Sequence, residues 1–301
     1  MRKILFIIAA SYLLINIELL AQTGQTGLSF LKLGVGGRAL GMGEAYSAIA
    51  SDPTATHYNP AALARSDYPQ VHMMHKEWIQ DMKTDFLSVS TSLNNFSFGI
   101  SVNITSVNDI PLRKISGPPI GTFDSRNAAF GISGAYKIDP SLSFGITTKY
   151  LYEKILVDEA TGYAVDLGGL YQTPWDVRFA FVVNNLGSMN ALDKEASKLP
   201  TSIRVGGAYQ LGIESMNGNI TFATDVVSFT LENKSHLYLG TEFDYSNLIA
   251  VRFGYQTGYE AKSFSTGIGI HYGMLQLDYA FVPFQSDLGS THTISLGFEF
   301  K

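Results

Sequence analysis

Few residues in this 301-residue chain are able to do acid–base, nucleophilic or metal chemistry, and they are scattered. The chain has six histidines and no cysteine, which excludes thiolate catalysis, disulfides and cysteine-built metal sites. It contains neither a His-Glu-x-x-His motif nor a Gly-x-Ser-x-Gly nucleophile elbow. His72 and His75 are an odd number of positions apart, so in a strand they point to opposite faces and make poor joint ligands. We therefore predict no catalytic residue, no metal site, no cofactor and no enzymatic activity.

Two other kinds of ligand are also disfavoured. Gly34, Gly36 and Ala39 match part of a dinucleotide-binding fingerprint, but that fingerprint needs a preceding strand and a βαβ unit, and neither pattern is present. Acidic residues outnumber basic ones by 26 to 21, which argues against nucleic acid as a partner. The charged side chains that remain have to be placed through the elements that carry them.

From Tyr68 onward, large apolar residues alternate with small or polar ones. Phe96, Phe98, Ile100 and Val102, for example, are interleaved with Ser97, Gly99 and Ser101. A period of two is typical of strands, whose successive side chains point to opposite faces. We predict fourteen strands, at residues 69–78, 84–93, 95–106, 124–138, 141–154, 161–173, 176–186, 200–212, 218–230, 235–246, 247–258, 262–273, 274–284 and 290–300.

The number and spacing of these strands favour a transmembrane barrel. Fourteen is even, and most segments are near the length of about 9–11 residues that a tilted strand needs to cross a bilayer. Connections after even strands are short, whereas those after odd strands are mostly longer, notably 107–123 and 187–199. Outer-membrane barrels have this asymmetry between periplasmic turns and outer loops. In hydrocarbon an open sheet edge has no water to satisfy it, so the last strand must pair with the first.

Aromatic residues mark one end of the predicted barrel. They sit on the apolar face at the ends of strands 4, 6, 8, 10, 12 and 14. A ring of aromatics at one level is what a membrane interface selects, and a soluble sandwich gives no reason for it. We predict that the following residues form a periplasmic aromatic girdle in contact with outer-membrane lipid: Tyr136, Tyr171, Tyr209, Tyr245, Tyr272 and Phe300.

Composition and the N-terminus agree with export. Charged residues make up only 16% of the chain, against about 25% in a typical soluble domain. Arg2 and Lys3 precede an almost wholly apolar run that ends at Ala21, which is the layout of a secretory signal peptide. We predict a signal peptide at 1–21, an N-terminal plug at 22–67 and a barrel at 68–301, in the bacterial outer membrane.

Parity along the strands also assigns charged residues to the barrel lumen. A charge on the lipid face near mid-membrane would cost about 2–4 kcal/mol, so an inward orientation is expected. A solvated, mutually paired wall and a substrate path are both open interpretations. The predicted lumen charges are Lys149, Asp166, Arg178, Arg204, Asp225, Glu242, Arg252 and Asp278.

Residues 27–67 do not alternate and are dominated by small side chains. Fourteen strands enclose a lumen too wide to be filled by the strands' own side chains, so this segment is a candidate filling. From the residues alone, Arg38, Glu44 and Asp52 are candidates to pair with lumen charges, and Asn59 to cap a turn that Pro60 begins. The predicted plug motif consists of Gly37, Arg38, Gly41, Met42, Gly43, Asp52, Asn59, Pro60 and Ala61.

This motif resembles the PorV/PorQ family, which belongs to the superfamily of the long-chain fatty-acid transporter FadL. The run from Gly37 to Gly43, then Asp52 and Tyr58-Asn59-Pro60-Ala61, carries the resemblance. Ala62 departs from it, since many relatives have glycine there. The resemblance implies that the N-terminal segment is a hatch inside the barrel, and that hydrophobic substrates of FadL-type members leave through a lateral opening in the wall.

Two functions follow from the resemblance. PorV-type members serve type IX protein secretion as partners of the translocon or of cargo C-terminal domains, and this interpretation is placed first. The alternative is a FadL-like channel that takes up hydrophobic small molecules such as fatty acids or aromatic hydrocarbons.

Overall fold

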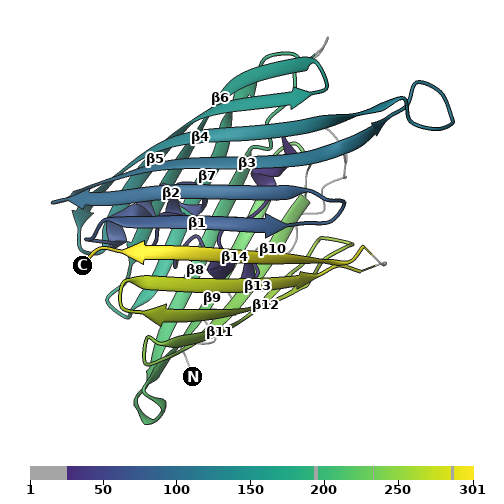
Figure 1. The fold of residues 1–301 in the computed structure, drawn as a ribbon. Coiled ribbons are helices and arrows are strands. Elements are labelled where there is room, and N and C mark those ends of the chain that lie inside the picture. Colours follow the sequence, from purple (N-terminus) through teal and green to yellow (C-terminus); the bar gives the residue numbers. More distant parts are fainter. Residues whose placement is uncertain (1–25, 193–195, 233, 286–287) are drawn as a thin grey trace.

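A computed structural model describes residues 26–192, 196–232, 234–285 and 288–301. Their strands form a closed antiparallel barrel, in which β1 (Gln70–Glu77) pairs with β14 (Ser290–Glu299), as Figure 1 shows. This confirms the predicted all-β class, the strand number and the closure. The predicted signal peptide at 1–21 lies outside the described residues. The other strands are β2 (Lys83–Leu93), β3 (Phe96–Leu112), β4 (Gly121–Asp139), β5 (Leu142–Ile155), β6 (Asp158–Gln172), β7 (Val177–Met189), β8 (Ser202–Ile213), β9 (Gly218–Phe229), β10 (Lys234–Tyr245), β11 (Ile249–Gln256), β12 (Phe264–Tyr272) and β13 (Leu275–Pro283).

The helices of the described residues are all short. Four of them lie in residues 26–67, which we call the N-terminal segment: η1 (Ser29–Lys32), α2 (Gly37–Gly41), α3 (Ala55–Tyr58) and η2 (Pro60–Arg65). A further turn, η3 (Glu214–Met216), joins β8 to β9. Over the described residues, no helix combines the length and the apolar character needed to cross a membrane.

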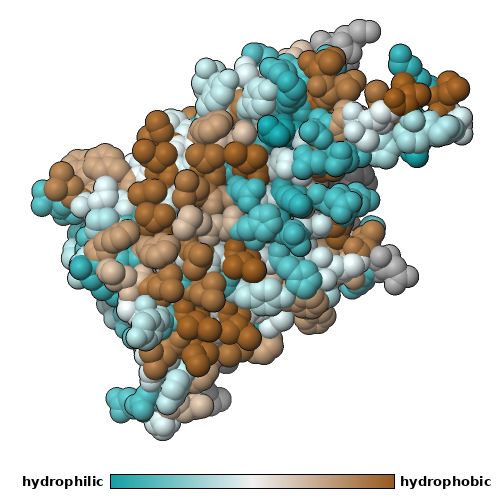
Figure 2. Space-filling view, viewed as in Figure 1, coloured by the Kyte–Doolittle hydropathy of each residue, from teal (hydrophilic) through white to brown (hydrophobic). Residues whose placement is uncertain are grey.

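The outer surface of the barrel is apolar. Large residues at strand positions that point outward, such as Leu87, Val89 and Ile294, are exposed, while the serines and threonines between them are buried. Figure 2 shows these apolar side chains as a band across the visible strands, with polar residues beyond it toward the end where β1 terminates. A contiguous apolar surface of this size needs lipid around it. The protein is an outer-membrane β-barrel.

The two ends of the barrel differ, as predicted. Short turns such as 94–95, 140–141 and 273–274 lie at one end, which we call the turn end, and the connections 78–82, 196–201 and 257–263 lie at the other, the loop end. The predicted loop 107–123 is wrong over much of its length, because β3 and β4 continue as a hairpin to Leu112 and Gly121. A bulge between Val107 and Ile110, with Asp109 at a positive φ of 57°, interrupts the alternation that would have marked this strand.

Within the part of the chain that the structure describes, no break in strand pairing opens the wall. The β2–β3 ladder is continuous from Lys83↔Ser106 to Leu93↔Phe96, and each described strand is paired with both of its neighbours. The lateral opening that the resemblance implies is therefore not seen as a gap between the described strands.

The N-terminal segment runs through the inside of this barrel (Figure 1, purple to dark blue). Near its start, the Gly27 amide donates to the Lys198 carbonyl in the loop end, and at its finish the Ser92 hydroxyl of β2 donates to the Ser66 carbonyl. Between these points α2 packs on β11–β14 and η2 on β3–β6.

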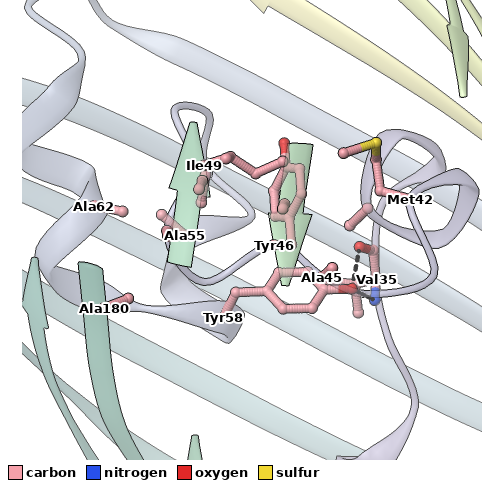
Figure 3. Close-up of a cluster of buried hydrophobic side chains, with 14 of the residues drawn as sticks. Val35, Met42, Ala45, Tyr46, Ile49, Ala55, Tyr58, Ala62 and Ala180 are labelled. Atoms are coloured by element: carbon pink, nitrogen blue, oxygen red, sulfur yellow. Dashed lines mark hydrogen bonds between the residues drawn. The ribbon is translucent and has the colours of Figure 1, made fainter. Parts of the chain in front are cut away.

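Most of the larger buried apolar cluster belongs to this segment. Tyr46 and Tyr58 meet edge to face, with ring centroids 5.2 Å apart, and the Tyr58 hydroxyl bonds both the amide and the carbonyl of Val35 (Figure 3). Met42 and Ile49 complete the centre of the cluster. The barrel therefore folds around its own N-terminal chain, because its strands present mainly small and polar residues inward.

Candidate functional site

Inward-facing glycines let the backbone of the N-terminal segment lie directly against the wall. A methyl group at Gly145 of β5 would come within 2.4 Å of the Ala61 nitrogen, and one at Gly168 of β6 within 2.2 Å of Asn59 Oδ1. A glycine inside a strand often marks such a close approach. Gly240, Gly254 and Gly267 likewise face segment backbone. A methyl at Gly206 would meet the Ser47 hydroxyl instead.

The glycines of the predicted plug motif make the matching contacts. The Gly37 amide donates to Ser295 Oγ of β14 at 2.7 Å, and Gly41 packs on Gly267. Gly43 has a φ of +62°, a conformation that residues other than glycine rarely adopt, and its backbone lies against Gly254. Met42 is fully buried. These contacts fix the segment against β11–β14.

Asn59 joins two parts of the segment to the wall. Its Oδ1 accepts from the Ala61 amide at 3.1 Å, which caps η2 with Pro60 in the first turn. Its Nδ2 donates to the Ser47 carbonyl and to the Gly169 carbonyl of β6. The Asn-Pro-Ala motif is thus a structural turn that touches the barrel.

A chain of four alternating charges holds α2 to the wall. Arg38 donates from Nε and Nη2 to the two Glu242 oxygens at 2.8 and 2.6 Å. Glu242 also accepts from Arg252 Nε at 2.6 Å, and Arg252 Nη1 donates to Asp278 at 2.6 Å. Burial lowers the pKa of Arg38, but the Glu242 charge outweighs it and leaves the pKa well above its usual value. We call these four residues the α2 charge network.

Two further ion pairs attach the middle of the segment. Lys262, in the loop between β11 and β12, lies 3.2 Å from Glu44. Burial raises the pKa of Glu44, but the positive charges of Lys262 and Arg204 outweigh it and leave the pKa below its usual value. Arg204 donates to the Glu44 carbonyl and to Asp225, which in turn accepts from the Ser47 amide.

The remaining predicted lumen charges also face inward. Lys149 lies 2.6 Å from Asp166, and the buried Arg178 donates to Gln210 at 3.4 Å. The expectation for Asp52 is wrong: it accepts from Thr54 and from the Tyr46 hydroxyl, within its own segment. The reason is that Asp52 caps the turn leading into α3, which uses its oxygens locally.

The six residues of the predicted girdle are all exposed on the outside. Tyr136, Tyr171, Tyr209, Tyr245 and Tyr272 lie at the turn-end termini of their strands, and Phe300 follows β14 there. Trp175, in a short turn at the same end, is exposed too.

Two pockets flank the N-terminal segment. The first, which we call the loop-side pocket, has about 420 Å³ of empty space that includes open solvent, and Trp78 and Phe284 lie at its rim, just beyond β1 and β13. Lys76, Lys262 and Glu44 supply its charges. The second has about 290 Å³ of empty space, which again includes open solvent, and lies between the segment and the inner faces of β2–β5, so we call it the β2–β5 pocket. Its lining residues are Leu31, Thr56, His57, Phe86, Ser101, Asn103, Ala129, Gly131 and Lys149.

Sequence reasoning missed the inward glycines and both pockets. The glycines are recognisable in the sequence as small residues at the inward-facing strand positions. Their role depends on the path of the N-terminal segment, which has no periodicity of its own. Lys76, Lys262, His57 and Asn103 carried no motif, and only the three-dimensional fold brings them beside the segment.

Several solved structures have the same fold. The toluene transporter TodX of Pseudomonas putida matches with a TM-score of 0.65 and 12% identity, over 88% of this chain and 98% of that one. The CymD monoaromatic hydrocarbon channel matches with a TM-score of 0.62 and 15% identity, over 89% and 98%. A FadL homologue of Pseudomonas aeruginosa matches with a TM-score of 0.58 and 12% identity, also over 89% and 98%.

These likenesses show that the chain shares its fold with FadL-like channels, and they do not bear on the PorV/PorQ family. Among curated proteins, no sequence matches the chain. The sequence profile of the Uncharacterised protein family UPF0164 matches residues 9–172, more than half of the chain. The protein belongs to the family UPF0164.

Proposed function

We propose that this protein is a non-enzymatic outer-membrane channel through which small hydrophobic compounds enter the cell, with the N-terminal segment as its hatch. The observation that carries the proposal is the fold shared with proteins described as a toluene transporter and a monoaromatic hydrocarbon channel.

The lumen supports the same proposal. A segment of small residues fills it, and the two pockets lie on either side of that segment, each with apolar and polar lining residues. The α2 charge network and the Glu44–Lys262 pair hold the segment by side-chain contacts to the wall. Passage from the loop-side pocket to the turn end then requires the N-terminal segment to shift from the wall.

The resemblance to PorV/PorQ placed type IX secretion first, with the translocon or cargo C-terminal domains as partners. The structural neighbours favour uptake instead, so we reverse that order.

Deletion of the gene distinguishes the two functions. We expect normal secretion of cargo proteins and slower uptake of a labelled aromatic hydrocarbon, restored by a plasmid copy. Impaired secretion with normal uptake would overturn the proposal and return the secretion hypothesis to first place.

A further inference from the structure

The connection between β11 and β12, residues 257–263, folds inward over the loop end of the lumen. Gly258 makes the turn: its φ is +82°, and a methyl group there would lie 2.6 Å from Nδ1 of the inward-facing His236 on β10. The Tyr259 ring then stacks on the His236 ring, with centroids 4.2 Å apart, and the hydroxyls of Tyr259 and Tyr238 lie 2.6 Å apart. The aromatic contacts hold this connection against the inner wall.

The same connection holds two consecutive residues of the N-terminal segment. Lys262 Nζ lies 3.2 Å from Glu44 Oε1, and Gln256, the last residue of β11, donates from Nε2 to the Gly43 carbonyl at 3.0 Å. Lys262 Nζ also lies 4.8 Å from the centre of the Tyr259 ring, where a cation is attracted by the ring face. A single charged group therefore contacts both the aromatic stack and the segment.

The backbone of the segment is strained at the residue that is held. Glu44 has a φ of +60°, in the left-handed region that residues other than glycine rarely adopt. Its side chain is buried against Lys262, and its carbonyl accepts from Arg204 of β8, so both parts of the residue are fixed from outside the segment. Such a conformation persists only where the surroundings impose it, and it is common in switch regions. Loss of the Lys262 contact would therefore favour a rearrangement of the segment at Glu44.

We propose that residues 257–263 are a lid whose opening is coupled to release of the N-terminal segment, with the Glu44–Lys262 pair as the latch between them. A lid that swings outward takes Lys262 away from Glu44, and residues 43–47 then relax from the wall. Coupling of this kind is reciprocal, so a segment that shifts also frees the lid. The inference rests on the proposed function, because it names how the hatch of the same channel is controlled.

Hydrogen–deuterium exchange of the purified full-length protein in detergent, followed by mass spectrometry, measures the lid and the segment separately. Lys262→Met removes the charge of the latch. We expect amide exchange to become about tenfold faster in residues 43–47, because a charge-assisted hydrogen bond is lost, and faster in residues 257–263 as well. Lys154→Met is the matched control, since it breaks the exposed Lys154–Glu159 pair and should leave both regions unchanged.

Tyr259→Leu loosens the lid without changing either residue of the latch. If the two movements are coupled, exchange becomes faster in residues 43–47 as well as in the lid. Added to Lys262→Met, the same substitution should not accelerate the segment further, because the latch is already broken. This variant also covers the case in which Lys262→Met fails to fold.

Faster exchange that is confined to residues 257–263 in Tyr259→Leu would overturn the inference, and so would an unchanged segment in Lys262→Met. Either result would mean that the loop and the segment are packed together but move independently. The uptake proposal is judged separately, by entry of toluene through the unmodified protein, so it stands or fails without this result.

Discussion

At the scale of single residues, the interior of this barrel consists of paired charges and of glycines, whose missing side chains leave room for the backbone of the N-terminal segment. Parity along the strands was enough to predict which charges point inward, because an outward charge in lipid is costly. It was not enough to pair them, because Arg38 and Glu242 are 204 positions apart and meet only through the closed barrel.

Glu242→Gln tests the α2 charge network. The substitution leaves Arg38 and the fully buried Arg252 facing a neutral amide, and breaking a buried pair costs about 3–5 kcal/mol. We expect the free energy of unfolding in urea, measured in detergent micelles, to fall by about that amount. Glu159→Gln, which breaks the exposed Lys154–Glu159 pair, should leave it unchanged. Equal effects of the two substitutions would show that the network is not what holds α2.

Gly145→Ala tests the close approach of the segment. The added methyl would lie 2.4 Å from backbone atoms of Pro60 and Ala61, so we expect a loss of about 1–3 kcal/mol and easier proteolysis of the segment. Gly134→Ala is the control, because a methyl at Gly134 on the neighbouring strand β4 meets nothing within 4 Å. A barrel that tolerates both changes equally would contradict the packing described here.

At the scale of elements, strands were predictable and the N-terminal segment was not. All fourteen strands follow from alternation, and the β3–β4 hairpin was underestimated because its bulge shifts the parity at Asp109. The segment carries only short helices whose positions depend on the glycines they contact, so its path has no local signature. Asn59 was the exception, since Asn-Pro marks a cap in any context.

We expect the His57 imidazole of α3 to make the stability of the folded protein depend on pH. Its pKa is lowered in the folded protein, so below its ordinary value of 6.5 the unfolded chain binds a proton that the folded chain does not. Stability should therefore fall as the pH drops below 6.5 and be unaffected by His57 above it. We expect His57→Gln to flatten the curve of unfolding free energy between pH 6.5 and 5. Parallel curves for the two proteins would mean that His57 takes up a proton without cost.

At the scale of the whole molecule, one physical arrangement underlies the account. Apolar side chains face lipid, polar side chains face inward, and a non-periodic segment fills what they enclose. Composition and alternation predicted the first two, because the bilayer imposes them on any such chain. The choice between uptake and secretion was not predictable in this way, because it depends on pockets and partners that alternation does not encode.

Uptake through a reversibly fixed lumen shows whether hydrophobic compounds pass this barrel by movement of the N-terminal segment. The chain has no cysteine, and the hydroxyls of Thr56 and Ser88 lie 3.3 Å apart, so Thr56→Cys with Ser88→Cys places two thiols close enough to link α3 to β2. The doubly substituted protein is expressed in a bacterium that lacks its own hydrocarbon channel, and entry of labelled toluene is measured. We predict entry above the empty-vector rate when the thiols are reduced, loss of that entry on oxidation, and recovery on reduction. Two results would contradict this prediction: toluene entry at the empty-vector rate although the barrel is correctly folded, or toluene entry that is equally fast with and without the disulfide.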